Sequence, residues 1–174
     1  MPTHEEELAF ADQAGRHFAR QFGMPPMVGR VAGWLLICEP PEQTAAEIAD
    51  GLHVSRSAVG AAIDALESFA FVRRSRAPGE RADRIEVNPE AGAQGLDTRA
   101  EFAAMAALVR QGLDVLAGET DARRARLLEV AAFYDWLLVR MPALADEWNR
   151  HRDELRASGQ LPDPTKTQTS EEPK

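Results

Sequence analysis

The stretch that decides the fold is residues 44–87, TAAEIADGLHVSRSAVGAAIDALESFAFVRRSRAPGERADRIEV. Its first part has the pattern of a short helix, because Thr44 and Glu47 have the spacing of a capping box. Gly51 is expected to end this helix, since glycine adopts the left-handed conformation at little cost. Leu52 and Val54 then flank a tight turn.

A second helix follows the turn, capped by Ser55 or Ser57. Its apolar residues recur at intervals of three and four: Val59, Ala62, Ile63 and Leu66. Two short helices joined by a glycine-containing turn predict a helix-turn-helix, whose second helix can enter the major groove of DNA. Ser55, Arg56 and Ser57 start this helix and are expected nearest the DNA. Arg56 is the main candidate for contact, because a guanidinium group pairs well with guanine or phosphate.

The middle of the second helix carries small residues on its predicted exposed face, Gly60 and Ala61. Small side chains offer few hydrogen bonds to base edges. Specificity is therefore expected to depend on groove shape and on contacts with thymine methyl groups.

A basic hairpin follows the two helices. Phe71 and Val72 begin one strand, residues 85–87 alternate as its partner, and Pro78-Gly79 is a turn signal between them. The hairpin carries five arginines: Arg73, Arg74, Arg76, Arg81 and Arg84. This is the pattern of a wing, so a winged helix-turn-helix is predicted. Arg76 and Arg81 flank the tip and are the candidates for phosphate or minor-groove contact. The other three either contribute to DNA contact or form surface ion pairs.

These segments resemble a known family. Residues 55–87 are similar to the recognition helix and wing of MarR-type bacterial repressors. Residues 23–52, GMPPMVGRVAGWLLICEPPEQTAAEIADGL, resemble the GbsR-like branch of that superfamily, where a Gly-x-Pro-x-x-x-Gly-Arg segment precedes the helix-turn-helix. The matching positions are Gly23, Pro25, Gly29 and Arg30. The resemblance covers about two fifths of the chain and implies a dimeric DNA-binding regulator that responds to a small ligand.

Composition is ordinary for a globular protein, with 44% hydrophobic and 28% charged residues among 174. The net charge of −8 argues against indiscriminate coating of nucleic acid but not against specific binding, because the arginines gather in the wing. No apolar run approaches the roughly 20 residues that span a bilayer. Glu5, Glu6 and Glu7 make the N-terminus acidic where a signal peptide would be basic, so a cytoplasmic location with no membrane partner is expected.

Helical patterns flank the predicted winged helix-turn-helix on both sides. Residues 4–22 predict an amphipathic helix, and residues 27–38 predict a buried one in which Gly29 and Gly33 allow close approach of another helix. Beyond the wing, a helix capped by Asp97 or Thr98 is expected to stop at Gly118.

The last predicted helix begins at Thr120 or Asp121, with an apolar pattern close to a heptad repeat. Pro142 is expected to interrupt or kink it, although the pattern continues to about residue 157.

The predicted fold is mainly α with a small β-hairpin wing, a winged helix-turn-helix joined to a helical dimerisation platform. We expect a dimerisation helix at 1–23, a DNA-binding domain at 24–90, a helical dimerisation region at 91–158 and a disordered tail at 159–174. Wide apolar stripes beside a small winged domain need a second surface, and a symmetric homodimer supplies one.

Polar residues give no sign of catalysis. His4, His17, His53 and His151 lack metal-ligand spacing, and no nucleophile–base pattern or phosphate loop is present, so neither enzyme activity, a metal nor a cofactor is expected. Cys38 follows an apolar run, which indicates an inert buried thiol rather than a redox switch.

Aromatic residues leave two interpretations open. Trp34, Phe133, Tyr134 and Trp136 serve either core and dimer packing or a pocket for an apolar or cationic small-molecule effector. Two functions remain: a dimeric regulator, with a repressor favoured, that reads a pseudo-palindromic operator in double-stranded DNA, or a winged-helix protein-interaction module that binds no DNA.

Overall fold

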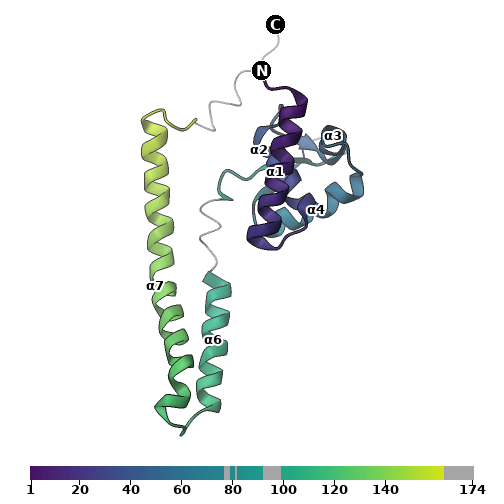
Figure 1. The fold of residues 1–174 in the computed structure, drawn as a ribbon. Helices are drawn as coiled ribbons and strands as arrows, with labels where there is room; N and C mark the ends of the chain where they lie inside the picture. Colours follow the sequence, from purple (N-terminus) through teal and green to yellow (C-terminus); the bar gives the residue numbers. More distant parts are fainter. Residues whose placement is uncertain (77–78, 81, 92–98, 163–174) are drawn as a thin grey trace. The chain divides into compact units, whose positions relative to one another are not determined.

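The computed structural model describes residues 1–76, 79–80, 82–91 and 99–162 (Figure 1). The chain divides into two compact units, of which the first ends at Ala91 and the second contains helices α6 and α7. The first unit therefore holds the whole stretch that the sequence marks as decisive.

Among the described residues, the first unit combines helices α1 to α4 with a small sheet. Its elements are α1 (His4–Phe22), α2 (Pro26–Ile37), β1 (Gln43–Thr44), α3 (Ala45–Gly51), α4 (Arg56–Ser68), β2 (Val72–Ser75) and β3 (Arg84–Val87). Helices α3 and α4 form the helix-turn-helix, and β2 with β3 forms the wing. The winged helix-turn-helix fold is confirmed.

A seam of small residues joins α1 to α2. A Cβ atom on Gly29 would lie 2.6 Å from the Ala14 carbonyl oxygen and 2.8 Å from the Gly15 Cα. One on Gly33 would lie 2.6 Å from the Ala14 Cβ. The predicted close approach at Gly29 and Gly33 is thus made by α1, which packs against its own subunit.

The helix-turn-helix begins as predicted. The Thr44 hydroxyl accepts a hydrogen bond from the Glu47 N–H at 3.2 Å, and the Glu47 carboxylate accepts one from the Thr44 N–H at 2.7 Å. This hydrogen bond lowers the pKa of Glu47, so the carboxylate stays ionised as it caps the helix. Of the two serines proposed as the next cap, Ser55 is the one used.

The reason proposed for Gly51 is wrong. Its backbone is not left-handed; the residue with positive φ in this turn is His53, at 55°. Instead, a Cβ on Gly51 would overlap the indole ring of Trp34. Glycine is required there by a packing contact between α2 and α3 rather than by the turn.

The sheet is antiparallel in the order β1-β3-β2. Within the wing, Val72 pairs with Val87 and Ser75 with Arg84. The two-residue strand β1 adds to the other edge of β3, with Gln43 opposite Ile85. This short strand, which the sequence pattern did not predict, anchors the wing to the start of α3.

The core of the first unit lies between α2, α3, α4 and the sheet. Its fully buried members include Val31, Ile48, Leu52, Val59, Ile63 and Leu66. The positions predicted to form the inner face of α4 are all buried. Because the inner face of α4 is packed against the core, the opposite face of this helix is directed towards solvent.

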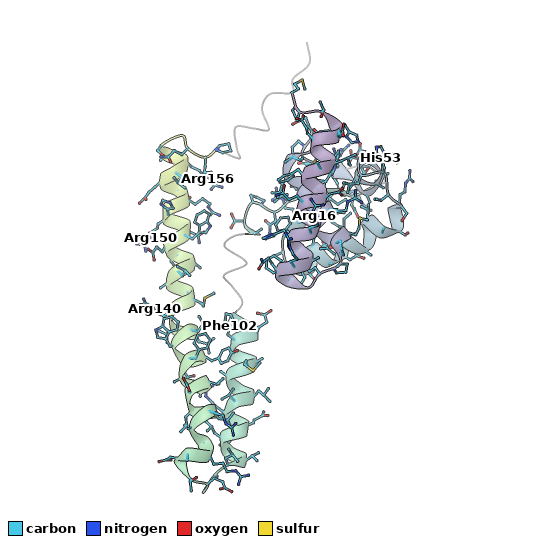
Figure 2. All side chains as sticks on the ribbon, in the orientation of Figure 1. Arg16, His53, Phe102, Arg140, Arg150 and Arg156 are labelled. Carbon is cyan, nitrogen blue, oxygen red and sulfur yellow. The ribbon has the colours of Figure 1, made fainter. Side chains whose placement is uncertain are left out.

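The second unit is a helical hairpin of α6 (Arg99–Val115) and α7 (Asp121–Ala157). Gly118 has φ of 86° in the turn, and the Thr120 hydroxyl caps α7. Phe102 of α6 meets Tyr134 of α7 with ring centroids 6.1 Å apart (Figure 2). Helix α7 continues through Pro142, so of the two expectations for this proline an interruption is wrong.

Two further expectations concern segments outside the described residues. They are the caps proposed at Asp97 and Thr98 and most of the predicted disordered tail. Within the part of the chain that is described, no helix has the length and hydropathy needed to cross a membrane.

Candidate nucleic-acid interface

The recognition helix α4 presents its predicted face to solvent. The Ser55 hydroxyl accepts a hydrogen bond from the Ala58 N–H and lies 3.2 Å from the Ser57 hydroxyl. Ser57, Ala61 and Asp64 are exposed, and a Cβ on Gly60 would meet no atom within 4 Å. Helix α4 is thus open to a ligand along its outer side, starting at the capped end.

Arg56 is the exposed cation at the start of this helix. It forms no ion pair with any residue that the structure describes. A guanidinium group without a protein carboxylate can donate to an external acceptor without first losing an internal one.

The wing arginines differ from Arg56, because each wing arginine that the structure describes forms an ion pair with an acidic residue. Arg73 Nε lies 2.5 Å from the carboxylate of Glu86, its direct neighbour across the ladder. Arg76 Nε donates to Asp83 Oδ1 at 2.7 Å, and this hydrogen bond lowers the pKa of Asp83 and raises that of Arg76. Both pairs are exposed enough for water and ions to compete with them.

Two further arginines connect the wing to its surroundings. Arg74 on β2 pairs with both Asp64 and Glu67 on α4, the latter at 3.0 Å. Arg84 on β3 pairs with Glu80 at 3.1 Å. Arg74 thus fixes the wing against the recognition helix. Arg73, Arg74 and Arg84 thus form surface ion pairs, and their contact with DNA stays a prediction.

A hollow of about 310 Å³ lies between α3, α4 and the wing. Arg56 and Gly60 line it from α4, Arg74 and Asp83 from the wing. Two cations predicted to contact DNA therefore face the same space, although they are 18 positions apart in the chain. Arg81, the other predicted tip residue, lies outside the described residues.

Sequence reasoning did not identify the acidic partners. They are Asp64 and Glu67, late in α4, and they hold Arg74. Their spacing of three on the exposed side of α4 places both carboxylates on one surface, which was the available signal.

The predicted aromatic pocket is divided between the two units. Trp34 is buried in the first unit, where its indole N–H donates to Gln43 Oε1 at 2.8 Å. Phe133, Tyr134 and Trp136 lie on α7 of the second unit, with Phe133 and Trp136 largely exposed. Trp34 is thus a core residue, and the ligand pocket stays a prediction.

Cys38 matches the inert alternative. It is buried, and this burial raises the pKa of its thiol to about 11. The thiol therefore stays protonated near neutral pH and is a poor nucleophile.

Comparison with known proteins supports the reading of the fold. A family model described as MmpR5-like MarR family transcriptional regulator matches residues 90–151, which include α6 and much of α7. The chain is 29% identical over 131 residues to the HTH-type transcriptional regulator MmpR5 of Mycobacterium tuberculosis (strain ATCC 25618 / H37Rv), covering 75% of this chain and 79% of that protein.

A solved structure described as that of a transcriptional regulator agrees with this chain at a TM-score of 0.74. The two are 25% identical, and the match covers 83% of this chain and 99% of the other. The relatives are regulators rather than enzymes. The chain, with its exposed recognition helix and arginine-bearing wing, is thus similar to MarR-family transcriptional regulators.

Proposed function

We propose that this protein is a dimeric regulator that binds a pseudo-palindromic operator in double-stranded DNA through α4 and the wing. The observation that carries the proposal is the position of Arg56, an exposed cation at the open, capped start of the recognition helix. That end of a recognition helix is the one that contacts base edges in helix-turn-helix proteins.

The outer face of α4 offers few side chains that could contact bases. Gly60 and Ala61 leave the middle of α4 without long side chains, so the helix can approach the groove floor closely. Arg56 and Arg74 line the hollow beside it, where a backbone phosphate could accept from both. Groove shape and phosphate position then contribute much of the specificity.

Dimerisation is supported by α7. None of its 37 residues is buried, and it carries Phe133, Trp136 and Val139 with exposed fractions of 53%, 57% and 75%. Large exposed apolar patches usually mark an interaction surface. A second copy would cover the stripe by two-fold symmetry and place two α4 helices about 34 Å apart, one turn of DNA.

The finer parts of the proposal are regulatory. A dimer seated on an operator would exclude the transcription machinery, so repression in the cytoplasm is the proposed outcome. A small effector that binds one separation of the α4 helices better than another would release the DNA. The GbsR-like branch remains our proposal on the segment from Gly23 to Arg30.

The direct test is selection of genomic fragments by the purified full chain, followed by titration of the enriched sequence. An enriched sequence with two inverted half-sites about one turn apart supports the proposal. Equal recovery of all fragments at physiological salt contradicts it.

Arg56→Ala is expected to weaken binding to the selected operator by about tenfold or more, as for loss of a bidentate guanidinium contact. Fluorescence anisotropy with a labelled duplex measures it. Arg16→Ala, which removes an exposed arginine from α1, is the matched control and should leave the affinity unchanged. Equal effects of the two substitutions would show that only net charge matters.

Asp83→Asn is expected to raise the affinity for the operator, whereas Arg56→Ala lowers it. Removing the carboxylate leaves Arg76 free to contact a phosphate, so the affinity should rise severalfold. The plot of log affinity against log salt concentration should also become steeper, by the amount that corresponds to about one additional phosphate contact. The same anisotropy titration at several salt concentrations measures both quantities. Asp83→Asn combined with Arg76→Ala should lose the gain.

One observation favours a second function. All four described wing arginines already have carboxylate partners, so the wing is less cationic than its sequence suggests. A winged-helix module that binds a protein rather than DNA would look the same. Fragment selection distinguishes the two, because an interaction module enriches no sequence.

A further inference from the structure

Two histidines from distant parts of the first unit meet at its surface. His4 lies in the first turn of α1. His53, labelled in Figure 2, lies in the turn between α3 and α4. Their Nε2 atoms are 3.3 Å apart, their ring centroids are 5.2 Å apart and the ring planes are 81° apart. The two nitrogens therefore face a common point although 49 positions separate them.

The distances satisfy the limits for a hydrogen bond and also fit two ligands of one ion. Two imidazole nitrogens at about 2.05 Å from a tetrahedral zinc ion are about 3.3 Å apart, with ring centres about 5.2 Å apart. A straight N–H···N bond at the observed Nε2 separation would place the ring centres roughly 5.6 Å apart. The separation of 3.3 Å is also longer than the usual range for such a bond.

A carboxylate and an aromatic ring lie beside His4. Glu7 Oε2 is 3.5 Å from His4 Nδ1, the ring nitrogen that does not face His53. The His4 ring meets the buried ring of Trp34 edge-on, with centroids 5.8 Å apart. Carboxylate partners of this kind orient metal-binding histidines and raise their basicity.

We infer that His4 and His53 bind one divalent transition-metal ion of the zinc type through their Nε2 atoms. Neutral imidazole suits this class of ion, whereas Mg²⁺ and Ca²⁺ prefer oxygen. The described residues contain no group of three or more metal-binding side chains, so the proposed site has two protein ligands and its other coordination positions would have to be filled by water. His4 is 46% exposed, which leaves room for that water.

Such an ion would join the start of α1 to the turn that leads into α4. Because it binds the folded arrangement and not the unfolded chain, it would stabilise the first unit by an amount that grows with the logarithm of the metal concentration above Kd. The inference does not depend on DNA binding, and it can be tested without DNA.

The test is calorimetric titration of the full chain with Zn²⁺ alone. Wild type is expected to bind one ion per chain, and His4→Gln or His53→Asn to weaken this by about tenfold or more. Asparagine is chosen at 53 because it tolerates the left-handed backbone there. His151→Gln is the matched control, since His151 also has a carboxylate three positions on, Glu154, but no second imidazole.

A second measurement separates ligand loss from misfolding. Long-range ¹H–¹⁵N spectra of the histidine rings should show the Nε2 signals of His4 and His53 shifting on addition of Zn²⁺, while those of His17 and His151 stay in place. Absence of a binding isotherm in the wild type overturns the inference. Binding that survives in both variants, or shifts confined to His17 or His151, also overturns it.

Discussion

Gly29→Ala is expected to lower the free energy of unfolding of the first unit by about 3 kcal/mol. The added methyl group would lie 2.6 Å from the Ala14 carbonyl oxygen and 2.8 Å from the Gly15 Cα, and backbone cannot turn aside as a long side chain can. Helices α1 and α2 must therefore separate, and the apolar contacts between them loosen. Urea denaturation followed by Trp34 emission, with Trp136 and Trp148 replaced by phenylalanine, reports on this unit alone.

Gly60→Ala supplies the control in the same background. Gly60 is also inside a helix, but a Cβ there meets no atom within 4 Å. Alanine should gain roughly 0.5–1 kcal/mol from helix propensity, so the two glycine substitutions should have opposite signs. If both variants unfold at the same urea concentration, the close packing of α1 on α2 is not a major source of stability.

Charging the exposed stripe of α7 is expected to separate the proposed dimer. With Trp136→Glu and Val139→Glu together, the chain should sediment as a monomer at micromolar concentration. Affinity for a duplex with two half-sites should fall by about a hundredfold, because the two readers no longer bind as one unit. Sedimentation equilibrium and anisotropy measure the two effects.

The matched variant keeps the stripe apolar. Trp136→Phe with Val139→Ile should remain dimeric and bind the operator as the wild type does. Both pairs of substitutions lie at exposed positions, so neither should unfold the hairpin of α6 and α7. A charged variant that stays dimeric would place the interface elsewhere, and a wild type that is already monomeric would remove the dimer from the proposal.

Local signals predicted most of the fold. The capping box at Thr44, the serine cap at position 55 and the left-handed Gly118 each depend on a few neighbouring residues, so the sequence alone carries them. The inner face of α4 follows from the same kind of rule, since its period is that of a helix. The candidate interface could be found in this way because Arg56 has a fixed offset from the cap.

Contacts between distant segments could not be predicted. Strand β1 has only two residues, too few for an alternating pattern. The need for glycine at 51 depends on Trp34, and the pairing of Arg74 depends on Asp64 and Glu67. In each case the partner is 7 to 42 positions away and is brought close only by tertiary packing.

The ion pairs of the wing arginines change the number of salt ions that would be released when the wing binds DNA. A free arginine that meets a phosphate displaces a condensed counterion, which makes affinity fall steeply with salt. An arginine that must first leave Glu86, Asp83 or Glu80 exchanges one partner for another and frees a carboxylate that recruits a cation from solution. The affinity of the wing for DNA would therefore depend less on salt concentration than its number of arginines implies.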